Sequence, residues 1–453
     1  MCPLWPLHIV LLYLLALCPL WFVACNLLPK AANHVWGVTF TPSELKALAM
    51  YKTSTVIAST SDWQNNSDAV VIRALVEDPE IASIKPDKLK FEKGENSTWV
   101  AKFNVTGEFL GYTSVNLCQI AKEGVVNNSE KCLKQSNKLS VSVTRENRIL
   151  DKIFTGSVIT LVSIIFINFG CALDIRSLKQ AIIRPIGPVI GLANHFLLLP
   201  LISYGLGLIL FPENRPLRLG FFFAGVSPAG GASNIWTYAL GGNLNLSVTM
   251  TAVSTLASFA FIPIWVFTLG AAIFSGGTLG VPYERIMTST VGLLIPLAIG
   301  YALQLYCKRL AAIMVRILKP FSALLILFIV VFAIVTNFYL FRLFTWEILV
   351  AGLLLPFIGY TIGWTLASLL KQVPEDKLAI CIETGVQNTG VAIFLLKFCL
   401  PQPAADITTV APVAVALMTP LPVIVFYLVR MCRKSGATIE EKLPTLVDEH
   451  IYL

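Results

Sequence analysis

Charged residues are scarce in this chain of 453 residues, where they make up 13% of the sequence. A typical soluble domain contains about 25% charged residues. Hydrophobic residues make up 56% and the mean hydropathy is +0.74. Apolar runs of about 20 residues, long enough to cross a bilayer, recur along the chain. The composition therefore excludes an ordinary soluble protein and predicts a membrane protein with several spans.

Catalytic signatures are absent as well. The chain contains four histidines, and its histidines and cysteines do not have the spacing of a zinc site. It has no glycine-rich phosphate-binding loop and no serine, histidine and aspartate set of the hydrolase type. These absences argue against an enzyme.

The net charge of +8 is a signal of membrane topology. Residues 33–149 carry a net charge of +1, whereas residues 150–453 carry +6 in the loops and ends around apolar segments; Lys30 supplies the remaining positive charge. Such a distribution gives no reason to expect a nucleic acid partner.

The N-terminal region predicts an exported domain. Residues 1–25 contain a short apolar core followed by small residues, which is typical of a signal peptide. The segment before the core has no Lys or Arg, so an uncleaved signal anchor is the alternative. Residues 33–149 alternate polar and apolar positions in short runs separated by turn residues, which predicts a small β-sandwich-like ectodomain.

Glycosylation sequons and cysteines support this compartment. Four sequons fall within residues 33–149 and predict an extracellular or lumenal glycoprotein; they are at Asn65, Asn96, Asn104 and Asn127. The only cysteines of the region, Cys118 and Cys132, are expected to form a disulfide in an oxidising compartment. Two free thiols are the alternative.

Residues 150–432 form the predicted transmembrane domain, and residues 433–453 a cytoplasmic tail. We expect about nine transmembrane helices, at residues 153–173, 187–210, 219–240, 245–270, 286–306, 321–341, 347–370, 378–400 and 407–429. With the N-terminal domain outside, the inner loops and ends hold 12 Lys and Arg residues and the outer ones six. The positive-inside rule therefore favours an outside ectodomain and a cytoplasmic C-terminus. The plasma membrane is the expected location and an internal secretory membrane the alternative.

One carboxylate, Glu383, lies well inside a predicted span. A charge at this depth costs at least about 2.5–3.5 kcal/mol, and no Lys or Arg lies at the same depth; Lys397 is expected to extend to the outer surface. The partner is therefore a proton or a cation from solution. Gly385 and Gly390 loosen the helix and free backbone carbonyls, and Gln387 and Asn388 add amide oxygens. A carboxylate surrounded by neutral oxygens is the environment that a small, hard cation prefers, so we expect a cation as the partner. A purely structural buried glutamate is the alternative.

A second span is interrupted in the same way, at Ser227–Asn234, which reads SPAGGASN. In the next span Ser247, Thr251 and Ser254 share one helix face; interhelical packing is the alternative explanation. The two interrupted spans are the third and the eighth, so they cross the membrane in opposite directions. Such a pair predicts inverted repeats with two crossed broken helices at a binding site, which brings Ser233 and Asn234 near Glu383.

These two segments resemble the bile acid:sodium symporter family. ETGVQNTG at 383–390 is similar to the E-[ST]-G-x-Q-N motif of that family, and SPAGGASN with NLSVTMTAVST behind it is similar to the other crossing segment. The resemblance covers about residues 150–432. The long ectodomain resembles that of the poorly characterised members of the family.

The resemblance implies a core domain and a panel domain that exchange by an elevator-like or rocking motion. It implies a first sodium site at Ser233, Asn234, Ser247, Thr251 and Glu383. A second sodium site would be formed by Glu383, Gln387, the backbone at Thr384 and Val386, and a position that is glutamine in the family and His195 here. His195 is therefore a nitrogen ligand, a proton-sensitive group or a packed side chain. Asn388 would face the substrate.

The expected function is sodium-coupled symport of an amphipathic organic anion, of bile acid or steroid sulfate type, by alternating access. Sodium is the coupling ion, the lipid bilayer is the surrounding partner, and no cofactor is expected. One alternative is an orphan membrane protein with a receptor-like or adhesion-like ectodomain and an inactive carrier. Another is proton-coupled transport through Glu383 and His195.

Overall fold

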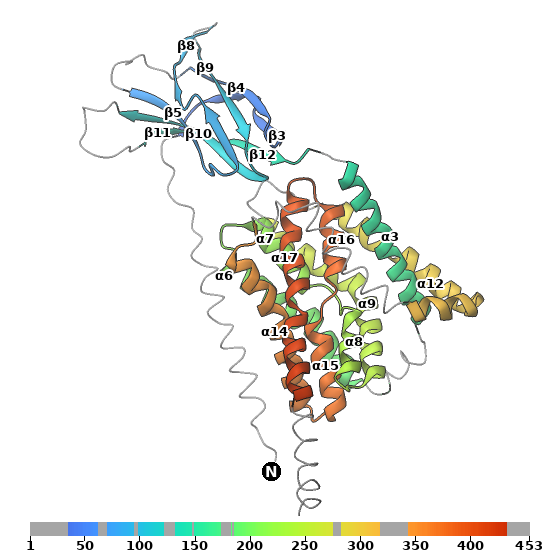
Figure 1. Ribbon diagram of the computed structural model, residues 1–453. Coiled ribbons are helices and arrows are strands. Elements are labelled where there is room, and N and C mark those ends of the chain that lie inside the picture. Colours follow the sequence, from blue (N-terminus) through green and yellow to red (C-terminus); the bar gives the residue numbers. More distant parts are fainter. Residues whose placement is uncertain are drawn as a thin grey trace, which may run out of the picture. The chain divides into compact units, whose positions relative to one another are not determined.

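The computed structural model describes residues 35–61, 70–94, 98–121, 132–146, 149–173, 183, 185–274, 282–317 and 343–432. These residues form a strand-built N-terminal unit and a helical unit that begins at Ile149 (Figure 1). The predicted signal peptide at 1–25, the sixth span at 321–341 and the tail at 433–453 lie outside the described residues.

The N-terminal unit contains two β-sheets that share one apolar core. Its strands are β1 (Val35–Trp36), β2 (Thr39–Thr41), β3 (Glu44–Ala49), β4 (Thr53–Thr60), β5 (Val70–Val76), β6 (Ala82–Lys85), β7 (Lys88–Leu89), β8 (Glu92–Lys93), β9 (Trp99–Gly107), β10 (Gly111–Ala121), β11 (Cys132–Ser136) and β12 (Leu139–Thr144). The first sheet has the order β1-β11-β10-β12-β3, with β5 paired to β10 and β7 to β5. The second has the order β2-β4-β9-β6, with β8 paired to β9. The prediction of a β-rich N-terminal region is confirmed.

Alternation along the strands builds the core between the sheets. Ala101, Phe103 and Val105 of β9 are buried while the residues between them are exposed. Val115 and Leu117 of β10 supply the opposite layer of the same cluster. A strand places successive side chains on opposite faces, so one apolar residue in two is sufficient to fill a core on one side.

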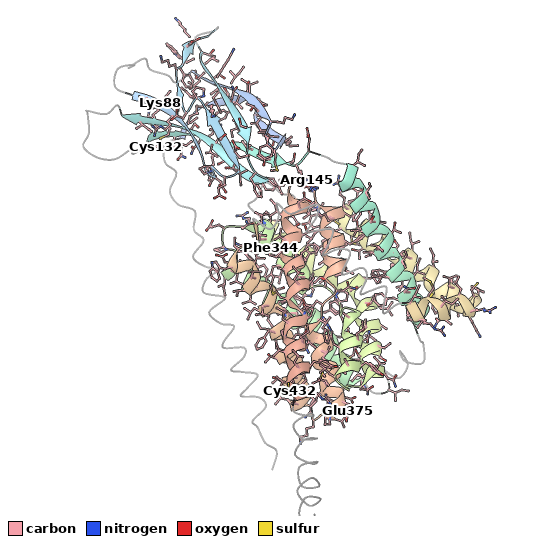
Figure 2. The ribbon with its side chains drawn as sticks, in the orientation of Figure 1. Lys88, Cys132, Arg145, Phe344, Glu375 and Cys432 are labelled. Atoms are coloured by element: carbon pink, nitrogen blue, oxygen red, sulfur yellow. A yellow bond between two sulfur atoms is a disulfide. The ribbon has the colours of Figure 1, made fainter. Side chains whose placement is uncertain are left out.

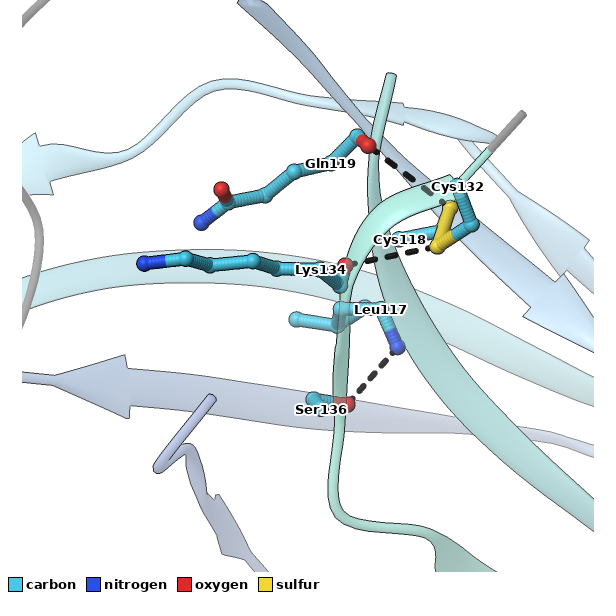
Figure 3. Close-up of a disulfide and its surroundings, with 6 residues drawn as sticks. All are labelled: Leu117, Cys118, Gln119, Cys132, Lys134 and Ser136. Atoms are coloured by element: carbon cyan, nitrogen blue, oxygen red, sulfur yellow. Dashed lines mark hydrogen bonds between the residues drawn. A yellow bond between two sulfur atoms is a disulfide. The ribbon is translucent and has the colours of Figure 1, made fainter. Parts of the chain in front are cut away.

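A disulfide joins Cys118 of β10 to Cys132 of β11 (Figure 3). Next to it, the backbone N–H of Leu117 donates to Ser136 Oγ at 2.8 Å. The bridge closes a loop with a sequence separation of 14. In the chain-entropy account, a loop of this size stabilises the folded state by about 3 kcal/mol. The bond therefore holds two neighbouring strands at the ends of residues 122–131.

The helical unit contains both continuous and interrupted helices. They are α3 (Ile149–Ala172), α5 (Ile186–Ala193), the π-helical turn η2 (Asn194–Leu198), α6 (Leu199–Leu210), α7 (Arg215–Gly225), α8 (Ala232–Ala239), α9 (Leu244–Trp265), the π-helical turn η3 (Val266–Gly270), α10 (Ala271–Phe274), α11 (Tyr283–Gly292), α12 (Leu294–Tyr306), α14 (Trp346–Leu369), α15 (Pro374–Gly385), α16 (Thr389–Cys399) and α17 (Ala404–Met418).

Five helical stretches are long and apolar enough to cross a membrane: Ile186–Leu210, Leu244–Phe274, Tyr283–Tyr306, Trp346–Leu369 and Ala404–Cys432. They coincide with the second, fourth, fifth, seventh and ninth predicted spans. The first predicted span corresponds to a shorter apolar helix, Gly156–Ala172. The third and eighth are each divided into two half-helices. A mainly helical membrane protein is thereby confirmed, and the total of nine stays a prediction.

A proline explains the π-helical turn in the second span. Pro200 has no N–H, so the carbonyl of Phe196, four residues earlier, has no intrahelical donor. The indole N–H of Trp265 donates to that carbonyl at 2.8 Å instead. Because a π-turn rotates the residues before it relative to those after it, the distortion sets the direction of Asn194 and His195, which are both buried.

Candidate functional site

Two helices of the unit are interrupted in mid-course. The first break separates α7 from α8 at Val226–Gly231, and the second separates α15 from α16 at Val386–Asn388. Pro228 contributes no N–H within the first break. Each break leaves backbone groups without an intrahelical partner, and such groups are costly away from water unless another segment pairs with them.

The two breaks pair with each other. The N–H of Gly230 donates to the carbonyl of Val386 at 2.8 Å, and the N–H of Asn388 donates to the carbonyl of Pro228 at 2.8 Å. These bonds flank an antiparallel bridge between Ala229 and Gln387. The interrupted segments therefore meet as a two-residue piece of antiparallel sheet, which satisfies the backbone that neither helix can satisfy alone.

Close approach at this point requires glycine. A Cβ on Gly230 would lie 2.7 Å from the carbonyl oxygen of Gln387 and 3.0 Å from its carbon. A Cβ on Gly385 would lie 2.1 Å from the ring of Tyr360 on α14. Both contacts are far below van der Waals separation, so these glycines permit the two breaks to touch and α14 to support the second one.

Glu383 lies in the last turn of α15 and is completely buried, with 0% of its surface exposed. Ser247 Oγ of α9 donates to its Oε2 at 2.7 Å, and the Thr251 hydroxyl donates to its Oε1. The Ala229 N–H donates to Ser254 Oγ at 3.4 Å, so α9 also contacts the crossing. Among the described residues no Lys or Arg forms an ion pair with Glu383.

Polar atoms around this carboxylate lack hydrogen-bond partners among the residues that the structure describes. They are Asn234 Oδ1 and both amide atoms of Gln387. The Ser233 hydroxyl lies close enough to Glu383 to act as a hydrogen-bond donor to its carboxylate. Asn234 Nδ2 donates to Thr251 Oγ1 at 3.3 Å, which directs its amide toward the same cluster. Buried polar atoms are normally paired, so the cluster offers unused oxygens beside a buried negative charge.

The π-helical turn places two further side chains against α15. His195 Nε2 lies 3.1 Å from the backbone carbonyl of Glu383. Because a carbonyl only accepts, Nε2 carries the hydrogen and donates it. Asn194 Nδ2 donates to Thr384 Oγ1 at 3.2 Å. The packed, hydrogen-bonded alternative for His195 matches this geometry, since its ring N–H bonds to the backbone carbonyl of Glu383.

A cavity of about 200 Å³ lies beside the cluster. Asn234, Thr251 and Thr255 contribute its polar wall, whereas Phe169 of α3 and Leu297 of α12 contribute apolar walls. The cavity is therefore amphipathic and is bounded by the first interrupted helix at Gly231 and Asn234, by α9 and by the α3–α12 pair. Asn388 is not among its lining residues; it caps α16, with its Oδ1 accepting from the Val391 N–H at 3.3 Å.

The remaining predicted sites lie elsewhere. Asn104 is exposed on β9, and its Oδ1 accepts from Thr55 Oγ1 at 2.9 Å. The sequon asparagines Asn65, Asn96 and Asn127 lie outside the described residues.

Sequence reasoning missed two buried polar features of the helical unit. Lys397 was expected to extend to the surface, but it forms an ion pair with Asp406 in the first turn of α17. Their side chains are only 13% and 1% exposed. Asn168 of α3 is completely buried and makes no hydrogen bond within the described part of the chain. Each is a polar residue in an apolar helix, and that local contrast was the available signal.

Comparison with known proteins gives a consistent assignment. The family described as the Sodium Bile acid symporter family matches residues 158–342. The human P3 protein is 31% identical over 265 residues, which is 57% of this chain and 54% of that protein. The matched part of the chain therefore spans about half the length of this relative.

Two relatives are covered more fully. Sodium/bile acid cotransporter 5 of Rattus norvegicus is 26% identical over 349 residues, which is 74% of this chain and 79% of that protein. This share exceeds what residues 150–453 can supply, so the similarity extends into the N-terminal unit. The ileal sodium/bile acid cotransporter of Cricetulus griseus is 30% identical over 255 residues, 55% of this chain and 72% of that protein. On this identity and coverage, the chain belongs to the sodium bile acid symporter family.

Proposed function

We propose that this chain is a sodium-coupled symporter of amphipathic organic anions, of bile acid or steroid sulfate type, that works by alternating access. The observation that carries the proposal is the buried carboxylate of Glu383, which has hydroxyl donors but no cationic partner among the described residues. Ser233 lies within hydrogen-bonding reach of the same carboxylate, and Asn234 Oδ1 has no donor within the part of the chain that the structure describes. Membership of a family of sodium symporters supports it.

The first sodium site would consist of Glu383, Ser233, Asn234, Ser247 and Thr251. One carboxylate with neutral hydroxyl and amide oxygens suits a hard monovalent cation. Ser247 and Thr251 direct their hydroxyl hydrogens to Glu383, so lone pairs of the carboxylate and of these hydroxyl oxygens remain available. Asn234 Oδ1 likewise has no donor among the described residues. A bound cation would accept lone pairs from all of them at once.

The second site would use Gln387, Glu383 and the backbone at Thr384 and Val386. The Val386 carbonyl already accepts from the Gly230 N–H, and the Glu383 carbonyl accepts from His195 Nε2. We propose that the His195 N–H substitutes for the second cation, so one sodium ion binds per cycle.

The crossing supports an inverted-repeat mechanism. Spans two to four and seven to nine would form the repeats, and spans one, five and six the panel, with the site at the point where the repeats meet. Sodium binding would neutralise Glu383 and lower the cost of moving the crossing through the membrane. The cavity beside Asn234 and Thr251 would then receive the substrate, its apolar body against Phe169 and Leu297. Asn388 would contact the substrate in another state of the cycle.

The proposed topology places the N-terminal unit outside and the C-terminus in the cytoplasm, in the plasma membrane. The disulfide and the exposed sequon residue Asn104 fit an oxidising compartment. The receptor-like alternative gains no specific support, because an inactive carrier has no need for unpaired oxygens around Glu383. Proton coupling through Glu383 and His195 is the remaining alternative, and the uptake measurement below distinguishes it from sodium coupling.

Uptake by the Glu383→Gln variant tests the proposal. Radiolabelled bile acids and steroid sulfates would be offered to vesicles in sodium and in choline medium. Loss of the charged ligand should reduce sodium-driven uptake by about a hundredfold, since removing one member of a buried charge pair costs about 3 kcal/mol or more. The matched control is Glu375→Gln, an exposed carboxylate in the first turn of the same helix.

The control should keep wild-type uptake, and both variants should reach the cell surface in equal amounts. Normal sodium-driven uptake by Glu383→Gln would reject the cation site. Uptake by the wild type that follows a pH step equally well without sodium would favour proton coupling instead.

A further inference from the structure

A second cavity lies behind the α15 helix, outside the site described above. It has a volume of about 240 Å³ and lies between α14, α15 and the Ala404–Cys432 span. Tyr360 and Trp364 of α14 line one side, and Cys381 and Ile382 of α15 line the other. Since Cys381 and Ile382 immediately precede Glu383, whatever fills this groove packs against the back of the helix that carries the buried carboxylate.

The groove offers an occupant no polar group. The Tyr360 hydroxyl donates to the Thr419 carbonyl at 3.0 Å, and the Cys381 thiol donates to the Tyr360 carbonyl at 3.2 Å. Both side chains therefore direct their polar atoms into the protein. An occupant with a hydroxyl or a charge in this space would lose its hydration without gaining a hydrogen bond, so the groove suits plain hydrocarbon.

The groove opens on a face that meets lipid. Phe357 and Trp364 of α14 and Phe426 of the last span line it and are each about half exposed. Both helices are long and apolar enough to cross a membrane. Within a bilayer, the molecules that reach such a face are lipids.

A guanidinium group lies at one end of the groove. Arg430 donates to the carbonyl of Leu240, and Leu240 is itself a lining residue. Arg430 makes no ion pair with a carboxylate among the described residues, and the carboxylate of Asp376 is held by Asn243 Nδ2 at 2.7 Å. Arginine has five N–H donors in a planar fork, so donors remain after the bond to Leu240.

The polar end of the groove is also an end of the helical unit. Figure 2 shows Glu375, in the first turn of α15, and Cys432, two residues after Arg430, at the same end of that unit. A membrane headgroup region would lie at such an end, with the acyl region along Trp364 and Phe357. The groove thus has a charged group, Arg430, at its end and apolar side chains along its length. A phospholipid has the same arrangement, with a charged headgroup followed by acyl chains.

We propose that this groove is a binding site for an anionic phospholipid, with its phosphate on Arg430 and one acyl chain between α14, α15 and the last span. Arg and phosphate form bidentate charge-assisted hydrogen bonds, and an acyl chain fills apolar space without needing a polar partner. A sterol fits less well, because its hydroxyl would lie within the groove or leave Arg430 unused. The bound chain supports α15 from the side opposite the crossing.

Photolabelling of the full-length protein tests the site. The protein would be placed in phosphatidylcholine nanodiscs that contain phosphatidylserine with a photoreactive acyl chain, and labelled peptides would be mapped by mass spectrometry. Label is expected on peptides that contain Trp364, Cys381 and Phe426. In Arg430→Gln the label there should fall by about tenfold, because the charge-assisted bonds to phosphate are lost, whereas Arg430→Lys should keep most of it.

The matched control is Arg309→Gln, an exposed arginine on the segment after α12. It removes the same charge away from the groove and should leave the labelling unchanged. Cys381→Trp fills the groove and should remove label even with Arg430 intact. Equal labelling of wild type and Arg430→Gln, stronger labelling by a photoreactive sterol, or label spread over all spans would overturn the proposal. Sodium-driven uptake plays no part in this assay, so its outcome is independent of the proposed transport function.

Discussion

Asn168 and Asn194 are two asparagines that the fold buries completely, with different consequences. Asn194 donates to Thr384 Oγ1 at 3.2 Å, whereas Asn168 makes no hydrogen bond among the described residues. On α3, Asn168 shares a helix face with Ile165, which packs against Ile393 of α16, and with Ala172, which lines the amphipathic cavity. An unpaired amide in this position opposes folding.

Asn168→Leu should therefore stabilise the protein. Removing a buried amide without a partner recovers about 1–3 kcal/mol of desolvation free energy, and leucine has a similar size. The measurement is the thermal unfolding midpoint of the purified protein in detergent. Asn194→Leu is the matched control and should lower the midpoint, because it removes a bond to α15. A lower midpoint for Asn168→Leu as well would show that its amide has a partner in the folded protein.

His195 gives a prediction on ion stoichiometry. Its N–H donates to the Glu383 carbonyl, and glutamine in its place would offer an oxygen that binds a cation. His195→Gln should therefore steepen the sodium dependence of uptake, with a Hill coefficient that rises from about one towards two. An unchanged slope would show that position 195 does not decide how many sodium ions bind.

At the scale of elements, the crossing depends on how closely two chain segments approach. The Gly230 N–H bonds to the Val386 carbonyl and the Asn388 N–H bonds to the Pro228 carbonyl, both at 2.8 Å. The two breaks approach this closely because residue 230 has no Cβ. The pairing holds the end of α15, and with it Glu383, against Ser247 and Thr251 of α9. The geometry of the site is therefore a consequence of backbone pairing.

Gly230→Ala should separate the two breaks. Its Cβ would lie 2.7 Å from the Gln387 carbonyl oxygen, and relieving that overlap displaces the oxygens around Glu383. We expect sodium-driven uptake to fall by about tenfold or more, since loss of about 1.4 kcal/mol is sufficient for that. Gly156→Ala on α3 is the control, because a Cβ there meets nothing within 4 Å. Equal uptake by both variants would contradict the proposed importance of the crossing.

At the same scale, the sequence predicts continuous elements better than their distortions. The span predicted at 187–210 is helical at Ile186–Leu210, and that predicted at 347–370 is helical at Trp346–Leu369, because hydropathy is a local property. The ion pair of Lys397 with Asp406 was missed. A lysine at the end of an isolated helix reaches water, but here the next helix folds back and supplies a carboxylate.

At the scale of the whole molecule, membrane topology is the property to test. The proposed arrangement places Asn104 outside the cell and Asn245, at the start of α9, on the cytoplasmic side. Both residues are exposed within sequons, so access to the glycosylation machinery decides which one is modified. Asn104→Gln should increase the electrophoretic mobility of the glycoprotein, whereas Asn245→Gln should not.

The difference in mobility between the wild type and Asn104→Gln should disappear once N-linked glycans are removed enzymatically from both proteins. A mobility change for Asn245→Gln alone would reverse the proposed orientation and would place the N-terminal unit in the cytoplasm.

The sequence alone determined the division into a strand-built and a helical unit, five of the spans and the residue types of the candidate site. These depend on composition, on periodicity and on Pro and Gly at the breaks, which act within a few neighbouring residues. Only the tertiary structure decided that Ser247 bonds to Glu383 across 136 residues of sequence, and that His195 donates to the Glu383 carbonyl. Both contacts require the interrupted helices to meet and pair their unsatisfied backbone, a long-range event that no local pattern specifies.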